Sequence, residues 1–340
     1  MAAGAFVLAA GFGTRLRPLT LHRPKPLVPV CGVTVLEQAL ALCLRHGIGE
    51  VVVNAHHLAE QIEAFCDPVA GMRVHVQVEL PEILGTGGGL KAAEGLLADR
   101  FAVVNGDVLC DGDLGALLAD CAAPGVEASL LLRRAPDAAK HGIVALDDAG
   151  RVARLTSLAC LDGSPPVAED THFTGIHALR RTALAHVTPA GFACIVRTAY
   201  VRLVPLGAVR GRLHAGTWLD VGEPQTYLTA CRAALDGALP LPIEPWERVG
   251  WGLRGEAEVG DCTDCDLHPT ARFVEPCWIG RGAVVEADAV VGAYSVVGQG
   301  ARVGRSARFA GSVVWDGCAV EPGAALMNAV VHDGGVLAAG

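Results

Sequence analysis

The sequence predicts an α/β domain with a doubly wound, mixed but mainly parallel sheet, followed by a solenoid of short strands. Short apolar runs alternate with amphipathic helical patterns up to about residue 235. Beyond the Pro-rich segment DGALPLPIEPWE, an apolar residue recurs at every sixth position instead. We therefore divide the chain into a first domain (1–235), a linker (236–255) and a C-terminal domain (256–340).

Four apolar runs in the first domain predict buried strands: AFVLAA, VVVNAH, VHVQVEL and FAVVNGDV. Three stretches have the spacing of amphipathic helices: VLEQALALCLRHG, which Gly47 is expected to end, LAEQIEAF and GGLKAAEGLLA. Alternation of strands and helices gives a mainly parallel sheet. After Asp107 the pattern loosens. The runs EASLLLRR, HGIVALDD, RVARLT and THFTGIHAL predict an added, partly antiparallel region over one end of the sheet.

The C-terminal domain has a six-residue period in two phases. Large apolar side chains occupy one phase: Leu267, Phe273, Ile279, Val285, Val291, Val297, Val303 and Phe309, with Trp315 next. Nearly all side chains two residues earlier are small: Cys265, Ala271, Cys277, Ala283, Ala289, Ser295, Ala301 and Ala307. Such a period builds a solenoid of short flat strands whose apolar residues point inward. The repeat resembles the left-handed parallel β-helix of hexapeptide proteins, which implies about three to four coils.

Composition and charge limit the possible functions. A chain of 340 residues with 51% hydrophobic residues can bury a sizeable core. A net charge of −9 argues against nonspecific nucleic-acid binding, which requires a broad field of Lys and Arg. The apolar start MAAGAFVLAAG lacks a basic region and runs into a glycine-rich loop, as a first strand does and a signal peptide does not. With no apolar run near the ~20 residues of a membrane span, we expect a cytoplasmic protein without a membrane partner.

The loop after the first predicted strand carries a basic patch. Its sequence GFGTRL places glycines where backbone amides can approach a phosphate, although it matches neither the P-loop nor the dinucleotide fingerprint. Arg15, Arg17, Arg23 and Lys25 lie here, and no acidic residue precedes Glu37. Lys25 stands between two prolines, in a segment expected to be extended, and is predicted to aim a point charge at a phosphate. A solvated turn is the alternative.

Two carboxylates follow apolar segments at positions suited to a metal ion. Asp107 ends the predicted strand FAVVNGDV at the carboxyl edge of the sheet, where doubly wound sheets bind ligands. Asp220 lies in WLDVGEP, again after an apolar pair. Mg2+ on a nucleotide takes one or two carboxylates together with phosphate oxygens and waters. Together with a phosphate loop, the two aspartates predict a Mg2+ site, whereas either one alone is as readily a turn or a helix cap.

These segments carry a resemblance to a known family. LAAGFGTRLRPLTLHRPKPL resembles the signature of the sugar-1-phosphate nucleotidyltransferases, and LGTGGGLKAA, VNGDV, FTGIHAL and WLDVGEPQTYL match later blocks in order. The catalytic domain is similar to mannose-1-phosphate guanylyltransferases and to the N-acetylmuramate-1-phosphate uridylyltransferase type. The resemblance implies Mg2+-dependent transfer of a nucleotidyl group from an NTP to a sugar 1-phosphate, giving an NDP-sugar and pyrophosphate. We expect GTP and mannose 1-phosphate; the alternative is UTP or dTTP with a glucose-type or N-acetylmuramic sugar 1-phosphate.

The resemblance also implies roles for individual residues. The nucleotide-binding positions are Leu8, Ala10, Gly11, Gly13, Thr14, Gly87 and Gly88, the last two beside the base. Arg15 would neutralise the departing pyrophosphate, and Lys25 would bind the sugar phosphate and the α-phosphate. Asp107 and Asp220 would hold Mg2+.

The sugar subsite is less complete in this sequence. The resemblance implies that Gly142 and Gly175 border the sugar. Many relatives carry a Glu-Lys-Pro motif near the strand that corresponds to RVARLT, and its glutamate touches sugar hydroxyls. This chain continues with SLACLDG instead. Glu169 or Asp170 is a candidate replacement, and a solvated loop is the alternative.

Other interpretations remain open. Hexapeptide proteins include acetyltransferases that use a histidine, for which His268 and His332 are candidates. A nonenzymatic regulatory subunit that binds nucleotide sugars is another class. A zinc set is a further possibility: Cys262, Cys265, His268 and Cys277. Core cysteines fit better, because Cys265 and Cys277 fall in the small-residue phase of the repeat. Exposed apolar faces on the β-helix lead us to expect a homo-oligomer.

Overall fold

The computed structural model describes residues 3–67, 71–134, 142–161, 163, 168–188, 191–243, 250–254, 257–260 and 264–338. The chain forms two compact units, and neither is continuous in sequence. The first comprises Met1–Phe12 and Ala39–Trp218, and the second comprises Gly13–Gln38 and Leu219–Gly340. The basic loop therefore belongs to the same unit as the C-terminal solenoid. Among the described residues, no helix combines the length and apolarity that a membrane span needs.

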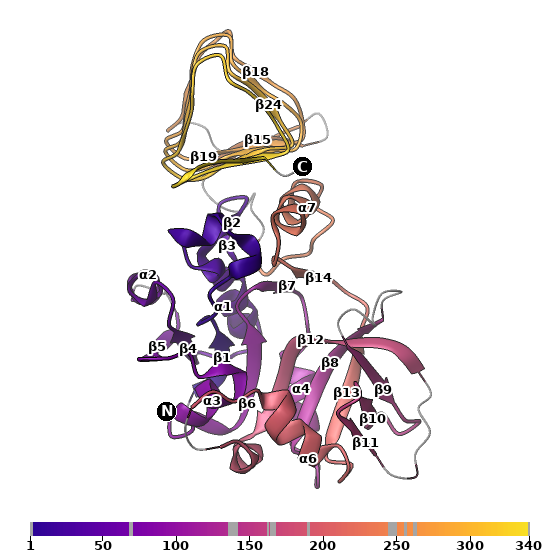
Figure 1. Cartoon of the computed structure of the whole chain (residues 1–340). Helices are drawn as coiled ribbons and strands as arrows, with labels where there is room; N and C mark the ends of the chain where they lie inside the picture. The colour runs from indigo at the N-terminus through magenta and orange to yellow at the C-terminus, as the bar shows by residue number, and fades with distance from the viewer. Residues whose placement is uncertain are drawn as a thin grey trace. The chain divides into compact units, whose positions relative to one another are not determined.

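A mixed sheet, ten-stranded in the described part of the chain, forms the first unit (Figure 1). β1 (Ala3–Leu8) pairs in parallel with both β4 (Glu50–Ala55) and β6 (Leu97–Asn105). β4 also pairs in parallel with β5 (Arg73–Val78). Four helices alternate with these strands along the chain: α1 (Val35–Arg45), α2 (Ala59–Cys66), α3 (Gly85–Ala92) and α4 (Leu114–Asp120). The predicted α/β sheet is confirmed.

Further strands add antiparallel pairs beside β6. β12 (Ala168–Arg180) pairs antiparallel with β6, with β8 (Ala128–Arg134) and with β9 (Ile143–Leu146). Other strands of the unit are β7 (Val108–Cys110), β10 (Val152–Leu155), β11 (Ala159–Cys160) and β13 (Val209–His214). Its remaining helical segments are the 3-10 helix Arg181–His186, the π-helix Val196–Tyr200 and α6 (Val201–Leu203). The partly antiparallel region expected after Asp107 is present.

Apolar side chains from the central strands fill the core of the first unit. The cluster includes Phe6, Phe101, Val103, Leu130 and Leu179, all fully buried. Burial of such side chains is the main favourable contribution to the folding free energy. Because protein cores are close-packed, the strand ends that carry polar residues are held in a rigid frame.

The second unit begins with the basic loop. The loop contains three short 3-10 helices: Thr14–Leu16, Leu19–Leu21 and Lys25–Leu27. It continues into the hairpin of β2 (Pro29–Val30) and β3 (Val33–Thr34). After β14 (Trp218–Asp220), α7 (Pro224–Leu235) begins with a capping box formed by Glu223 and Thr226.

The C-terminal part of the second unit is a left-handed β-helix, drawn as the triangular stack in Figure 1. Its first face contains β17 (Asp266–Leu267), β20 (Val284–Val285), β23 (Arg302–Val303) and β26 (Ala319–Val320). Its second face contains β18 (Arg272–Phe273), β21 (Val290–Val291), β24 (Arg308–Ala310) and β27 (Ala325–Met327). Its third face contains β19 (Cys277–Gly280), β22 (Ser295–Val297), β25 (Val313–Val314) and β28 (Ala329–His332). Strands stacked within these faces are parallel.

Antiparallel strands extend the third face at both ends. β15 (Gly250–Arg254) pairs with β19 and with β16 (Ala257–Gly260). β29 (Gly335–Ala338) pairs with β28. β15 lies within the segment expected from the sequence to be a linker, and its backbone hydrogen bonds attach it to the solenoid.

The six-residue phase of the β-helix slips by one residue in its later part. Ile279 pairs with Val297, 18 residues on, whereas Val297 pairs with Val314, only 17 residues on. Val314 therefore enters the core, and Trp315 faces α7, where its Nε1 donates a hydrogen bond to Tyr227 Oη at 2.9 Å. The prediction that Trp315 continues the inward phase is wrong. Because Val314 and Trp315 are both apolar, the sequence alone does not reveal the slip.

Candidate active site

The carboxyl ends of β1 and β6 lie side by side and carry several predicted site residues. Leu8 at the end of β1 is in register with Asn105 at the end of β6, and the Gly106 amide donates to the Leu8 carbonyl at 2.9 Å. Asp107 follows directly. A Cβ at Gly11 would meet nothing within 4 Å, so the backbone after β1 is open there. The first unit thus gathers four predicted residues at one edge of the sheet: Leu8, Ala10, Gly11 and Asp107.

Two buried polar side chains brace this edge, and neither is among the residues predicted from the sequence. Asn54 and Glu79 are each 2% exposed. Asn54 Oδ1 accepts from the Ala9 amide at 2.7 Å, and its Nδ2 donates to Glu79 Oε1 at 2.7 Å. Glu79 Oε2 accepts from the Leu84 amide at 2.7 Å. This chain of bonds holds the loop after β1 against the turn before α3. In the sequence, each of the two could have been noticed as a polar residue within an otherwise apolar strand pattern.

Gly87 and Gly88 lie in the first turn of α3 against a neighbouring backbone segment. Their amides both donate to the Ala193 carbonyl, at 2.8 and 3.1 Å. A Cβ at Gly88 would be 2.7 Å from the Gly191 carbonyl oxygen. The close approach of two backbones therefore explains why glycine occupies these positions. Both glycines are buried in this contact.

The two glycines predicted to border the sugar both have left-handed backbone conformations. Gly175 has φ +84°, and a Cβ there would lie 2.3 Å from Asn105 Nδ2. Gly142 has φ +88°, and a Cβ there would lie 2.9 Å from Thr156 Cγ2. Gly175 thus lies against Asn105, which ends β6 two residues before Asp107, whereas Gly142 lies immediately before β9.

The two acids considered as replacements for the missing glutamate lie near the start of β12. Asp170 forms an ion pair with Arg134 at 3.1 Å, and both side chains are more than half exposed. The side chain of Glu169 lies outside the described residues. Asp170 thus pairs with a solvated arginine, and it lies in strand β12 rather than in a loop.

In the second unit, Asp220 lies between two basic side chains. Lys25 Nζ donates to Asp220 Oδ1 at 3.4 Å, and Arg15 Nη2 donates to Oδ2 at 3.3 Å. Lys25 is only 6% exposed, whereas the Arg15 side chain is 60% exposed. A Cβ at Gly222 would be 2.9 Å from both carboxylate oxygens, so the glycine keeps space beside them. Arg15 Nη1 also lies 3.9 Å from Glu223 Oε1, so the group comprises two cations and two carboxylates. Lys25 and Arg15 are its side chains suited to a phosphate.

The loop that presents Lys25 depends on a glycine turn. Gly13 has φ +60°, and a Cβ there would lie 3.0 Å from Lys25 Cβ and 2.9 Å from Thr20 Cγ2. Thr20 Oγ1 donates to the Gly13 carbonyl at 2.8 Å and closes the loop. Thr14 begins the first 3-10 helix. The expectation that Lys25 lies in extended chain is wrong: Lys25 begins a 3-10 helix, because Pro26 suits the start of a helix, where no amide donor is needed.

The residues of the alternative interpretations lie in ordinary packing positions. Cys277 is buried in the β-helix core and Cys265 packs against that core, as expected, while Cys262 lies outside the described residues. His332 is 6% exposed and packs edge-on against an indole ring, with centroids 5.7 Å apart. His268 accepts a hydrogen bond from the amide two residues on, at 3.2 Å. These contacts give no support to an acyl-transfer histidine or to the zinc set considered as an alternative.

Comparisons of this chain with a family model, with relatives and with a solved structure agree with one another. The family model described as nucleotidyl transferase matches residues 4–156. A mannose-1-phosphate guanylyltransferase of Mycobacterium tuberculosis is 31% identical over 287 residues, 83% of this chain and 76% of the relative. A UTP–glucose-1-phosphate uridylyltransferase of Synechocystis sp. is 26% identical over 323 residues, 83% of this chain and 81% of the relative. The crystal structure of HddC from Yersinia pseudotuberculosis complexed with GMP-PN has a similar fold (TM-score 0.54, 21% identity), covering 67% of this chain and 98% of that one.

Proposed function

The chain belongs to the sugar-1-phosphate nucleotidyltransferase family, and from this premise we propose that it transfers a guanylyl group from GTP to mannose 1-phosphate. The relatives named mannose-1-phosphate guanylyltransferase support this choice of substrates. The similarity to a uridylyltransferase supports the alternative pair, UTP and glucose 1-phosphate. The placement of Lys25 and Arg15 around Asp220 is the observation that carries the proposed chemistry.

The reaction needs charge neutralisation more than proton transfer. An oxygen of the sugar phosphate forms a bond to the α-phosphorus of the nucleotide. The bond from that phosphorus to the bridging oxygen breaks, and pyrophosphate leaves with the electron pair. The nucleophile is already an anion, so no base is required. The obstacle is repulsion between two polyanions, which positioning and fixed cations overcome.

Each charged residue has a distinct task in this proposal. Lys25 binds the sugar phosphate and the α-phosphate, and its burial strengthens that interaction because the local dielectric constant is low. Arg15 is exposed, as suits a group that neutralises the departing pyrophosphate and releases it. The backbone positions proposed to bind the nucleotide are Leu8, Ala10, Gly11, Gly13, Thr14, Gly87 and Gly88. Those proposed to border the sugar are Gly142 and Gly175.

Asp107 and Asp220 are the proposed Mg2+ ligands. Mg2+ prefers carboxylate oxygens and phosphate oxygens, and it keeps part of its water shell. The donor set fits this preference, and the absence of a side chain at Gly222 leaves room beside both oxygens of Asp220. When bound, the ion would neutralise charge on the phosphates. Asp220 would then hold the ion with its carboxylate while keeping Lys25 and Arg15 oriented.

The test is pyrophosphate release in the presence of Mg2+, with GTP, UTP, dTTP, CTP and ATP each crossed against a panel of sugar 1-phosphates. GTP with mannose 1-phosphate should give the highest kcat/KM. In Lys25→Ala, kcat/KM should fall by about 10³-fold with the fold intact, since one cation at the reacting phosphate is lost. Lys91→Ala is the control, because Lys91 lies on α3 and forms an ion pair with Glu94. A higher kcat/KM with UTP and glucose 1-phosphate would favour the alternative, and a silent panel would favour a regulatory subunit.

Three further expectations belong to this proposal. We propose that the enzyme works in the cytoplasm and forms a homo-oligomer. We also retain the sequence-based division into a catalytic domain (1–235), a linker (236–255) and a β-helix domain (256–340). The acidic net charge of −9 supports small anionic substrates bound locally rather than a nucleic-acid partner.

A further inference from the structure

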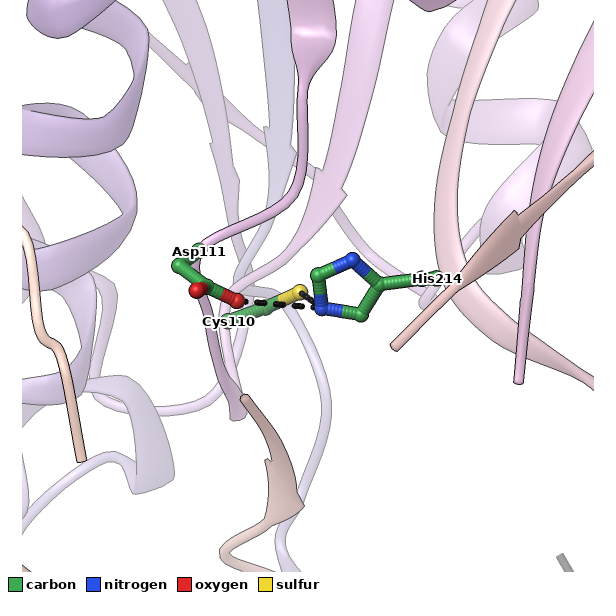
Figure 2. A group of neighbouring side chains, drawn as sticks. All are labelled: Cys110, Asp111 and His214. Atoms are coloured by element: carbon green, nitrogen blue, oxygen red, sulfur yellow. Dashed lines mark hydrogen bonds and ion pairs between the residues drawn. The ribbon is translucent and has the colours of Figure 1, made fainter. Parts of the chain in front are cut away.

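Cys110, Asp111 and His214 form a cluster that the proposed reaction does not use (Figure 2). Cys110 ends β7, Asp111 follows it, and His214 ends β13, so two strands of the first unit supply the three side chains. His214 Nε2 lies 3.0 Å from Asp111 Oδ1 and 3.7 Å from Cys110 Sγ. The three donor atoms all lie within 4.8 Å of one another. Cys, His and carboxylate donors together are typical of a transition-metal site.

The cluster contains more hydrogen-bond acceptors than hydrogen-bond donors. His214 Nε2 is also 3.0 Å from the Thr217 carbonyl oxygen. One N–H on Nε2 can donate to only one of these oxygens. Asp111 Oδ1 is buried and has no aligned hydrogen bond in the described structure, although it lies at ion-pair distance from His214. A buried carboxylate oxygen without a donor is costly, and a cation at this point would relieve it.

The spacing of the donors matches a tetrahedral zinc site. Zn2+ binds sulfur at about 2.3 Å and imidazole nitrogen or carboxylate oxygen at about 2.0–2.2 Å. Tetrahedral angles then place sulfur about 3.6 Å from nitrogen, and nitrogen about 3.3 Å from oxygen. The observed 3.7 and 3.0 Å are within a few tenths of an ångström of these values. A thiolate and a carboxylate would also balance the charge of a divalent ion.

A glycine keeps the space around the cluster clear. A Cβ at Gly216 would lie 2.5 Å from Asp111 Oδ1 and 2.8 Å from His214 Cε1. A side chain there would push the carboxylate and the imidazole apart. The loop between His214 and Thr217 can therefore bring its backbone close to the donor atoms, which a compact metal site requires.

We propose that Cys110, Asp111 and His214 bind one divalent transition-metal ion, Zn2+ by preference, at a site separate from the Mg2+ of the reaction. Cys110 binds as the thiolate after its proton passes to solvent, and Asp111 binds through Oδ1. His214 binds through Nε2 and carries its proton on Nδ1. The Thr217 carbonyl oxygen or a water completes four ligands. Sulfur and nitrogen donors select Zn2+ over Mg2+.

The ion would connect two segments that lead to the proposed Mg2+ ligands. Cys110 comes three residues after Asp107, and His214 comes six residues before Asp220. Joining the ends of β7 and β13 through one ion would restrain the segment that follows Asp107 and the segment that precedes Asp220. This positioning role rests on the proposed function, whereas the binding of the ion does not.

The experiment uses the full chain, reduced and stripped of metal with a chelator, in buffer containing millimolar Mg2+. Titration with Zn2+ in a calorimeter should show one ion per chain. Titration with Co2+ should give the near-ultraviolet charge-transfer absorption of a Co2+–thiolate bond. Cys110→Ser should abolish that absorption, and Cys110→Ser and His214→Gln should each weaken Zn2+ binding by about 100-fold or more.

Two controls separate this site from incidental binding. His75→Gln removes a histidine–carboxylate pair of the same spacing, with His75 Nε2 2.9 Å from Glu50 Oε1. Cys121→Ser removes another buried thiol of the first unit. Both controls should bind Zn2+ like the original chain, and circular dichroism should show all variants folded. Zn2+ affinity unchanged in folded Cys110→Ser, or charge transfer that persists there, would overturn the proposal whatever the result of the substrate panel. Should His214→Gln fail to fold, the Co2+ spectra of the original chain and of Cys110→Ser decide alone.

Discussion

The first unit and the β-helix bury different sets of side chains. In the first unit, Asn54, Glu79 and His177 are each at most 2% exposed. In the β-helix, valine and alanine make up most of the apolar core, and the buried polar side chains include Ser295, Ser312 and His332. A repeated coil meets similar neighbours above and below, so a repeated apolar side chain is sufficient. A sheet whose strands end at a candidate site must also fix polar groups, and it does so by bonding buried polar side chains to one another.

Substitutions in the two regions should therefore lower the free energy of unfolding for different reasons. In the first unit, the cost of a substitution should come from polar groups left without partners. In the β-helix, it should come from backbones that pack too closely to admit a side chain. Substitutions of each kind, in order of decreasing expected loss of stability, test this contrast.

Glu79→Leu should have the largest effect. The change leaves the Asn54 side-chain amide and the Leu84 backbone amide without their acceptor, at about 1–3 kcal/mol each. The free energy of unfolding, measured by denaturant titration, should fall by roughly 3–4 kcal/mol. Glu94→Leu is the control, because it removes a surface carboxylate paired with Lys91 and should cost under about 1 kcal/mol. Equal losses in the two variants would contradict the bracing role of Glu79.

Gly298→Ala should come next, and it tests the β-helix. A Cβ at Gly298 would lie 2.5 Å from the Asp316 backbone nitrogen of the next coil, and a backbone cannot yield easily. The free energy of unfolding should fall by roughly 2–3 kcal/mol. Gly300→Ala is the matched control: Gly300 has φ +63° but nothing within 4 Å, so only backbone strain of about 1 kcal/mol is added. If both variants melt alike, close packing of coils is not what requires glycine at 298.

A pH dependence should follow from His177. Burial lowers the pKa of His177 to about 3, and its Nδ1 forms a hydrogen bond with Tyr200 Oη. Between the ordinary value of 6.5 and about 3, the unfolded chain binds a proton that the folded chain does not, so stability falls as the pH drops below 6.5. At pH 5 the loss is about 2 kcal/mol. In His177→Phe, the difference in unfolding free energy between pH 7 and pH 5 should shrink by that amount; an unchanged difference would refute the assignment.

The smallest effect should come from the bond between Trp315 and Tyr227. Trp315 Nε1 donates to Tyr227 Oη, which donates in turn to the Pro29 carbonyl at 2.7 Å. A double-mutant cycle with Trp315→Phe and Tyr227→Phe should give a coupling energy of about 1 kcal/mol. Thermal melting of the four proteins supplies the measurement. Additive effects would mean that Trp315 contributes by apolar burial alone.

Most of the architecture was accessible to the sequence because it depends on periodicity. Alternating strands and helices predict the sheet, and the period of six predicts the β-helix. The slip that turns Trp315 outward was inaccessible, since Val314 and Trp315 are both apolar and either fits the pattern. The assignment of residues 13–38 to the same unit as the solenoid was equally hidden, because it depends on contacts between distant segments.

The candidate site could be predicted only in part from the sequence. Charge and glycine placement single out Lys25 and Asp220, but their ion pair joins segments 195 residues apart. His214 escaped notice for the same reason, since it lies 104 residues from Cys110. Sequence spacing instead drew attention to cysteines near residue 265, which the repeat places in or against its core. Local motifs identify chemistry, whereas clusters assembled from distant strands require the fold.

Two tryptophans of the β-helix together set the number of coils that can lie between them. Trp278 packs so closely on the β2–β3 hairpin that a Cβ at Gly32 would lie 2.4 Å from its ring. Trp315, about two rungs further along the stack, bonds to Tyr227 on α7. Inserting one whole coil between the two tryptophans would shift one of them by about 4.8 Å, the spacing of neighbouring strands, and break one contact. The number of coils between Trp278 and Trp315 is therefore fixed by these two contacts.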